Sequence, residues 1–310
     1  MEKFLLLEIK SCELCDSNDF QLIYEWPPEY YSHKKFETCS WDGREEITLN
    51  IVKCNHCGLV QSRPSFKEEY LHKVYPEDIV PVNVNIETVF GMRHRKYKSL
   101  LNIISRHISE GTLIDVGSRY GVFPWMANKL YGYNSYGLEY NSEAVKLGKQ
   151  KFGNLHQGTV DDLPKFIAEH GIINTEIIVL DDVLEHLVHP ARDIQKISQI
   201  QRKGNFLFLR QMDYDSFGRK LFRKNWYYFQ PAAHQFYFNE KSIKDLLNNN
   251  DYEIVKIYRP NLITNIFMTP VEMIYMKIRR FLENNKKDLY LTKRLKMYDD
   301  MFLVVAQKSK

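Results

Sequence analysis

The chain has 310 residues, of which 44% are hydrophobic and 26% are charged. This balance is that of a globular protein long enough for one large domain and a small one. Residues 1–90 carry a net charge of −7, with 9 Lys and Arg against 16 Asp and Glu, whereas residues 91–310 carry +11. Because a phosphate backbone is neutralised by Lys and Arg, the acidic first part argues against a nucleic-acid clamp there.

The sequence also bears on membranes and on location. No run reaches the eighteen or so apolar residues of a membrane span, and the apolar stretch at the start is interrupted by Glu8 and Lys10, which makes it too short for a signal peptide. We therefore expect a cytoplasmic protein. Residues 276–296 hold eight Lys and Arg against two acids. They could touch an anionic membrane surface peripherally or a phosphate-bearing acceptor, or they could form a solvated face.

Four of the five cysteines form two Cys-x-x-Cys pairs, Cys12 with Cys15 and Cys54 with Cys57. Such a turn points two thiolates at one tetrahedral ion, so the two pairs supply four ligands for a structural Zn²⁺. The alternatives are buried thiols, disulfides or a redox pair, and disulfides are rare in the cytoplasm. The 38 residues between the pairs exceed the roughly 15–20 of a usual zinc ribbon. An inserted hairpin or loop in a zinc-ribbon-like module is therefore expected.

The rest of the chain alternates between strand and helix patterns. We predict a zinc-binding module over residues 1–80, a connecting segment with an amphipathic helix (86–108) over 81–110, and the main domain over 111–310. Predicted strands cover 112–117, 134–140, 155–158 and 176–182, and predicted helices cover 123–132, 142–153 (from a serine cap) and 161–171. Such alternation predicts an α/β fold with a doubly wound, parallel sheet.

The stretch "LIDVGSRYG" (113–121) suggests where a ligand binds. The strand runs through Asp115 into a turn with Gly117 and Gly121, and glycines there let the backbone approach a ligand beyond the carboxyl end of the strand. Glu139 ends the second strand, where a carboxylate can accept both hydroxyls of a ribose. A dinucleotide fingerprint would need glycines at 119 and 122, which are Arg119 and Val122 here. A nucleoside is therefore the expected ligand.

The pattern Asp115-x-Gly117-x-x-x-Gly121 resembles the first motif of class I S-adenosylmethionine-dependent methyltransferases, with Arg119 in place of the usual middle glycine. Segments 158–164, 179–190, 204–216, 226–257 and 301–308 resemble later segments of that family in the right order. The resemblance implies a Rossmann-like, mostly parallel sheet, a methyltransferase activity (EC 2.1.1 class) and S-adenosyl-L-methionine as cofactor. The cofactor-binding residues that it implies are Asp115, Gly117, Gly121, Glu139, Asp161 (at the adenine amino group) and Asp182.

A zinc module that ends in "CNHCGLVQ" (54–61) and is fused to this core resembles the zinc-containing sugar methyltransferases of deoxysugar and surface-glycan pathways. That resemblance implies a sugar, nucleotide-sugar or glycan acceptor, methylated on oxygen or carbon. One departure is Ala233, which precedes His234 where the family has a glutamate. The alternatives are a zinc-module RNA methyltransferase, which the acidic first part disfavours, and an inactive methyltransferase-like binding protein.

Methyl transfer needs an acceptor held close to the methyl carbon and can need a base. His186, after the fourth strand, and His234, before an aromatic strand, are the two candidates, although each could instead be a structural histidine. Glu185 is a third candidate, either orienting a catalytic histidine or lying on the surface. The aromatic residues Trp226, Tyr227, Tyr228 and Tyr237 could form a sugar-stacking wall or belong to the core. The sequence does not indicate the oligomeric state.

Overall fold

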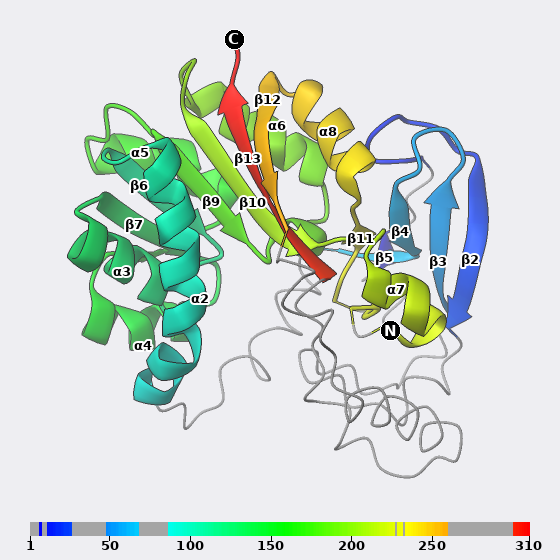
Figure 1. The fold of residues 1–310 in the computed structure, drawn as a ribbon, viewed down its shortest axis with the longest axis horizontal. Helices are drawn as coiled ribbons and strands as arrows, with labels where there is room; N and C mark the ends of the chain where they lie inside the picture. Colours follow the sequence, from blue (N-terminus) through cyan, green and yellow to red (C-terminus); the bar gives the residue numbers. More distant parts are fainter. Residues whose placement is uncertain are drawn as a thin grey trace.

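The computed structural model describes residues 6–7, 11–26, 48–67, 86–226, 228–231, 233–259 and 300–310. These residues form a central sheet covered by helices, with a smaller antiparallel sheet beside it (Figure 1). The basic stretch 276–296, Tyr227 and Cys39 lie outside the described residues. Within the described part, no helix is both long and apolar enough to cross a membrane.

The central sheet has seven strands in the order β12-β13-β10-β9-β6-β7-β8. They are β6 (Thr112–Val116), β7 (Asn134–Glu139), β8 (Leu155–Gln157), β9 (Ile177–Asp181), β10 (Phe206–Met212), β12 (Tyr252–Tyr258) and β13 (Met301–Lys308). Strands β6 to β10 pair in parallel, whereas β13 runs antiparallel to both of its neighbours. The chain order reverses between β6 and β9, which is where a doubly wound sheet opens a crevice for a ligand. The predicted fold class is confirmed.

Helices cover both faces of this sheet. One face is covered by α2 (Ile86–His107), α3 (Val122–Tyr131) and α4 (Ser142–Phe152), and the other by α5 (Leu163–Glu169), α6 (Pro190–Ile200) and α8 (Glu240–Asn248). Successive strand residues point to opposite faces, so Leu113 packs against the first layer and Ile114 against the second. A strand buried on both faces must be apolar throughout. This explains the unbroken apolar runs in the sequence.

Two predicted helix starts are wrong in detail, and two helices were not predicted. The cap of α4 is the Asn141 side chain, which accepts from the Ala144 N–H, and not a serine. The segment 161–171 begins with a 3₁₀ turn, η3 (Val160–Asp162), because Thr159 caps it first. The unpredicted helices are α6, whose first residue is a proline, and the short α7 (Phe217–Phe222).

The smaller sheet carries the cysteine pairs. Its order is β11-β4-β3-β2, built from β2 (Phe20–Trp26), β3 (Leu49–Cys54), β4 (Val60–Arg63) and β11 (Phe236–Tyr237); β1 (Leu6–Leu7) pairs separately with β5 (Ser65–Phe66). Strands β2 and β3 are antiparallel neighbours that flank the long insertion. They lead into and out of the expected insertion, but residues 27–47 lie outside the described part, so its form, hairpin or loop, stays a prediction.

Strand β11 joins the two parts of the chain. It comes from the long C-terminal part, yet it pairs with β4 of the cysteine module. Just before it, the Ser62 N–H donates to the Gln235 carbonyl at 2.9 Å, and Ser62 Oγ donates to the His234 carbonyl at 2.9 Å. The boundaries near residues 80 and 110 stay a prediction, but the segment with His234 is hydrogen-bonded to the N-terminal sheet.

We expect Ser62→Ala to lower the free energy of unfolding by about 1–3 kcal/mol, because the substitution removes a donor from a buried carbonyl. Ser62 is fully buried. The matched control is Ser105→Ala, whose hydroxyl also donates to a backbone carbonyl but at an exposed position on α2. There the change should stay within about 0.5 kcal/mol. Urea unfolding measures both, and equal effects would contradict the coupling of β4 to the His234 segment.

Candidate functional site

The four cysteines of the two pairs converge. Cys12 Sγ lies 3.4 Å from Cys57 Sγ, Cys15 Sγ lies 3.6 Å from Cys54 Sγ, and all four sulfur atoms are within 4.8 Å of one another. Tetrahedral zinc with bonds of about 2.3 Å places its sulfur ligands about 3.8 Å apart. The thiols are not joined as disulfides. The donor set therefore fits one zinc ion.

Cations and backbone amides surround this cluster. Lys241 Nζ donates to the Cys57 carbonyl at 2.9 Å, and the Arg63 guanidinium lies 3.6 Å over the Phe20 ring and bonds to the Ser11 carbonyl. A four-thiolate zinc site carries a net charge of −2, which these two cations would offset. The pKa of Cys57 is lowered to about 5, first by the hydrogen bond from the Cys12 thiol and also by a backbone N–H at residue 59.

The loop between β6 and α3 has the backbone that the glycine pattern predicted. Gly117 has φ 76° and Gly121 has φ 75°. A Cβ at Gly117 would lie 2.4 Å from Val183 Cγ2, so residue 117 must be glycine for the loop to pack against the chain after β9. Arg119 between them also has a positive φ, 52°.

Glu139 lies at the carboxyl end of β7, as predicted, and is 4% exposed. Its Oε2 accepts the Arg119 N–H at 2.7 Å and its Oε1 accepts the Asn141 N–H at 3.0 Å. Burial raises its pKa, and these two N–H groups oppose that shift. Each carboxylate oxygen offers two lone pairs. The Tyr140 N–H also contacts the carboxylate, so at least one of the four lone pairs remains for a ribose hydroxyl.

The three predicted aspartates differ in their surroundings. Asp115 is buried inside the sheet, and burial raises its pKa well above the usual value. Asp161, in η3, is half exposed and pairs with Lys196 of α6. Asp182 follows β9 with φ 59°. Its pKa is lowered, because the charges of Lys96 and Arg210 outweigh the opposing effect of burial.

A network of four charges closes the carboxyl end of β9. Lys96 Nζ of α2 lies 2.7 Å from Asp181 Oδ2 and 3.0 Å from Asp182 Oδ2. Arg210 of β10 pairs with Asp181 and, at 2.6 Å, with Asp182. The network fixes α2 across the ends of β9 and β10. Lys96 and Arg210 were not predicted from the sequence. Arg210 could have been found, because a lone arginine inside the apolar strand "FLFLRQM" indicates a buried partner of opposite charge.

Glu185, His186 and His234 form a second cluster, in which one ligand atom of each lies within 4.8 Å of the others. The two imidazole rings have centroids 4.8 Å apart. His186 Nδ1 donates to the Ala233 carbonyl at 3.0 Å, and His234 Nδ1 donates to the Tyr228 carbonyl at 2.7 Å. Because a carbonyl only accepts, both Nδ1 atoms carry the proton, and Nε2 of each neutral ring is the basic nitrogen.

Burial keeps Glu185 and His186 of this second cluster uncharged at neutral pH. Burial lowers the pKa of His186 to about 4 and raises the pKa of Glu185 to about 8. Glu185 is 2% exposed, so the surface alternative is wrong. Among the described residues its Oε2 has no hydrogen-bond partner. At neutral pH the cluster therefore contains a neutral imidazole, which can accept a proton, beside a neutral carboxylic acid.

Two of the aromatic candidates belong to the core. Trp226 is 2% exposed and donates from Nε1 to Asp300 Oδ2 at 2.8 Å, and Tyr237 is 1% exposed. Both pack with the N-terminal sheet. Tyr228 is half-buried, and its ring lies nearly parallel to that of His234 at 6.5 Å. Of the described candidates, Tyr228 is thus the one that is not fully buried and lies beside His234.

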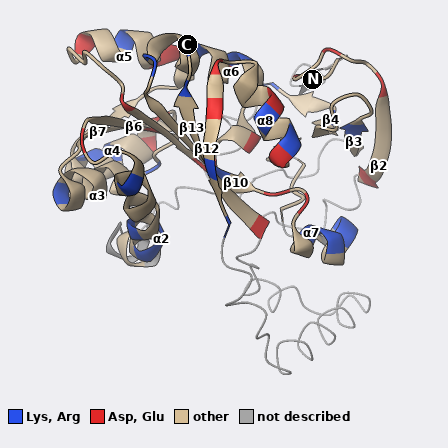
Figure 2. Ribbon diagram, turned by 45° about the horizontal axis from the view of Figure 1, so that its top comes forward, with Lys and Arg blue, Asp and Glu red and all other residues tan. Residues whose placement is uncertain are grey.

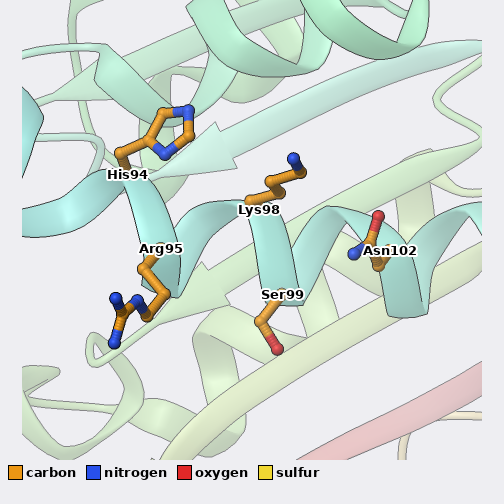
Figure 3. A pocket seen from close by; sticks show the side chains of 5 residues that line it. All are labelled: His94, Arg95, Lys98, Ser99 and Asn102. Atoms are coloured by element: carbon orange, nitrogen blue, oxygen red, sulfur yellow. The ribbon is translucent and has the colours of Figure 1, made fainter.

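A pocket of about 420 Å³ lies along α2 and is lined by His94, Arg95, Lys98, Ser99 and Asn102 (Figure 3). All but His94 are exposed. This face of α2 is turned away from Tyr97 and Leu100, which are buried in the core. None of the predicted site residues lines the pocket, so we do not assign the reaction to it.

A family model described as a methyltransferase domain matches residues 91–257, which is more than half of the chain. A sequence comparison with curated proteins gives no match.

Three solved structures illustrate what this chain is similar to. An S-adenosylmethionine-dependent methyltransferase from Thermotoga maritima has 14% identity and a TM-score of 0.46, over 73% of this chain and 95% of its own. One from Archaeoglobus fulgidus has 15% identity and a TM-score of 0.49, over 70% and 94%. The magnesium protoporphyrin IX methyltransferase from Synechocystis has 12% identity and a TM-score of 0.44, over 74% and 87%. Likenesses this distant indicate no acceptor.

We expect the purified chain to hold about one zinc ion, and Cys54→Ala to lose it and to destabilise the N-terminal sheet, since three thiolates leave the tetrahedral site incomplete. Elemental analysis of protein prepared without chelator measures the metal. Cys39→Ala is the control and should keep it. His186→Asn should also keep it, whereas a second ion lost in that variant would assign a metal to the histidine cluster. Zinc-free wild-type protein would refute the site.

We expect Glu139→Ala to weaken S-adenosylhomocysteine binding by roughly 10- to 150-fold, as the loss of charge-assisted bonds worth about 1.5–3 kcal/mol implies. The variant also removes an acceptor from two backbone N–H groups, so a matched control is needed. Glu176→Ala likewise removes a carboxylate with two donors, at the amino end of β6, where Glu176 Oε2 accepts the Thr112 N–H at 2.8 Å and Oε1 accepts the Asn174 side-chain amide at 2.6 Å. Calorimetry should show lost affinity only for Glu139→Ala, and an equal affinity in both would place the nucleoside elsewhere.

Proposed function

Because the chain belongs to the methyltransferase-domain family and is thus an S-adenosylmethionine-dependent methyltransferase, we propose that it methylates an oxygen or carbon of a sugar or glycan-type small molecule. The cofactor supplies a methyl group activated by its sulfonium. In this proposal Gly117, Gly121 and Glu139 hold the nucleoside, with Asp115, Asp161 and Asp182 as further cofactor-site residues, and Cys12, Cys15, Cys54 and Cys57 hold a structural zinc ion. A cytoplasmic location belongs to the same proposal, since reduced thiolates persist there.

The observation that carries the proposal is the pairing of His186 and His234. Their rings, with centroids 4.8 Å apart, come from segments that are far apart in the chain. A sugar hydroxyl, or a carbon beside a carbonyl, must lose a proton when it takes the methyl group, and a neutral imidazole is the side chain suited to accept it. Glu185 is the third member of this catalytic cluster, and its buried carboxyl group lies within 4.8 Å of both histidines.

The RNA methyltransferase alternative would require a basic surface beside this cluster. Two described cations near the cluster, Lys96 and Arg210, are paired with Asp181 and Asp182. Lys and Arg elsewhere are distributed over several helices, α2, α7 and α8 among them, and on α8 acids lie between them (Figure 2). These features favour a small acceptor. The basic stretch 276–296, for which a membrane surface, a phosphate-bearing acceptor and a solvated face were the alternatives, lies outside the described residues.

The direct test is mass-spectrometric detection of methyl transfer from S-adenosylmethionine to a panel of nucleotide-linked sugars, with capsule-type glycans and RNA beside them. A methylated sugar supports the proposal. A methylated RNA, with binding that weakens steeply as salt rises, would replace it by the RNA alternative. A chain that fails to bind S-adenosylmethionine at all would be an inactive binding protein.

We expect His234→Asn, His186→Asn or both to lower turnover by about 10²–10⁴-fold, with His234 slightly favoured because its segment faces the acceptor. The Asn amide keeps a donor near the Nδ1 position and removes Nε2, so the melting temperature and S-adenosylhomocysteine affinity should hardly change. The matched control is His170→Asn, since His170 Nδ1 bonds the Phe166 carbonyl at 2.9 Å on α5. Near-normal rates in both variants would mean that these histidines are not the base.

The pH dependence distinguishes the two histidines. A base works when it is unprotonated, so the rate falls as the pH drops through its pKa. Burial lowers the pKa of His186 to about 4. If His186 is the base, kcat/KM should therefore stay level from neutral pH to well below the 6.5 of a free imidazole. An acidic limb at pH 6.5 or above, unchanged in His186→Asn, would assign the base to another group.

A further inference from the structure

Arg119 has a backbone conformation that does not require an arginine. It has φ 52°, in the left-handed region that glycine adopts without cost. Its N–H donates to Glu139 Oε2 at 2.7 Å, a bond that glycine would make equally well. The backbone therefore gives no reason for a long cationic side chain here, and the reason must lie in what the guanidinium contacts.

Within the described residues, the guanidinium of Arg119 makes no hydrogen bond and has no carboxylate within 4.0 Å, although the residue is only partly exposed. Arg93 of α2 is in the same situation, apart from a 3.4 Å bond to Tyr97 Oη. The pKa of Arg119 is lowered by burial and then by the charge of Arg93. By contrast, Lys96 and Arg210 are both paired with aspartates. Two adjacent guanidinium groups are thus left for an anion.

The position of Arg119 indicates which anion this is. Its backbone touches Glu139, which is proposed to hold the ribose. Its charge also reaches the catalytic cluster, because the pKa of His186 is lowered mainly by burial and additionally by Arg119. A cofactor that extends from Glu139 to the histidines must place its amino-acid part between them. That part ends in an α-carboxylate, and no cation other than these two guanidinium groups is left over there in the described residues.

We propose that Arg119, with Arg93 beside it, binds the α-carboxylate of S-adenosylmethionine. The inference rests on the proposed function, because it presupposes that the nucleoside binds at Glu139. A guanidinium presents two parallel N–H groups that match a carboxylate, which makes it suited to this task. Arg119 then takes over in this chain a contact that a glycine at the same position could not make through a side chain.

The test compares two ligands that differ in the carboxylate alone, S-adenosylmethionine and its decarboxylated analogue, which keeps the sulfonium and the terminal amine. Calorimetry measures both ligands on wild type, Arg119→Gly and Arg223→Gly. Arg223 is the matched control, because it has nearly the same φ, 50°, but is exposed at the end of α7. Glycine adopts a positive φ more readily than arginine, so the backbone conformation at these positions should destabilise neither variant.

We expect wild type to prefer S-adenosylmethionine over the analogue by about 10- to 100-fold, the value of a charge-assisted pair. Arg119→Gly should abolish most of that preference by weakening only the carboxylate-bearing ligand, and Arg223→Gly should leave it unchanged. A preference that survives in Arg119→Gly overturns the inference. A second result would also overturn the inference. If Arg119→Gly keeps its affinity for S-adenosylmethionine but is no longer inhibited by inorganic pyrophosphate, the arginine binds a phosphate of the acceptor instead. Wild type that binds neither ligand would instead refute the proposed function.

Discussion

The two-residue strand β11 is the constraint on which the rest of the site depends. It pairs with β4 of the cysteine module, and the residues just before it bond to Ser62 on one side and to the chain after β9 on the other, where the Gln235 N–H donates to the Glu185 carbonyl at 2.8 Å. The first cysteine turn touches the same loop, since His189 Nδ1 lies 3.0 Å from Glu13 Oε1. The N-terminal sheet therefore supports the segments that carry His186 and His234. The geometry of this histidine pair thus depends on the folding of the cysteine module, which is far away in the sequence.

A second constraint is the charge network at the carboxyl end of β9. Lys96 belongs to α2 and Arg210 to β10, and both reach Asp181 and Asp182. Pairing compensates the desolvation of these aspartates and holds α2 across the sheet edge. It also pairs Lys96 and Arg210, while burial is the largest single influence on the pKa values of Glu185 and His186. The paired charges of Lys96, Arg210, Asp181 and Asp182 therefore stabilise the fold, whereas the proposed proton transfer falls to His186 and His234.

Much of the fold could be predicted from the sequence because its main signals are local. Apolar runs such as "TLIDV" and "EIIVLD" and the glycine-bearing turns identify the strands and their order, and each predicted strand of the central sheet is present. The pairing of β11 with β4 could not be predicted in this way, since it joins residues about 175 positions apart and each strand residue involved is ordinary by itself. The same limit applies to Lys96 and to the burial of Glu185. Their roles depend on which elements become neighbours, which periodicity does not encode.

Glu185 also bears on the main departure from the resemblance noted in the sequence. Ala233 occupies the place of the glutamate that precedes the second histidine, and here it is fully buried among apolar residues of the N-terminal sheet core. A carboxylate in that position would have to be desolvated, which is costly. The backbone carbonyl of Ala233 instead orients His186 through its Nδ1, and the carboxyl group beside the two rings comes from Glu185. With its pKa raised to about 8 by burial, that group is a neutral acid near pH 7. It can therefore donate a hydrogen bond to a basic ring nitrogen or to an acceptor oxygen. The loss of the glutamate at 233 thus leaves the cluster with a carboxyl group and with both histidines held in the tautomer that a base requires.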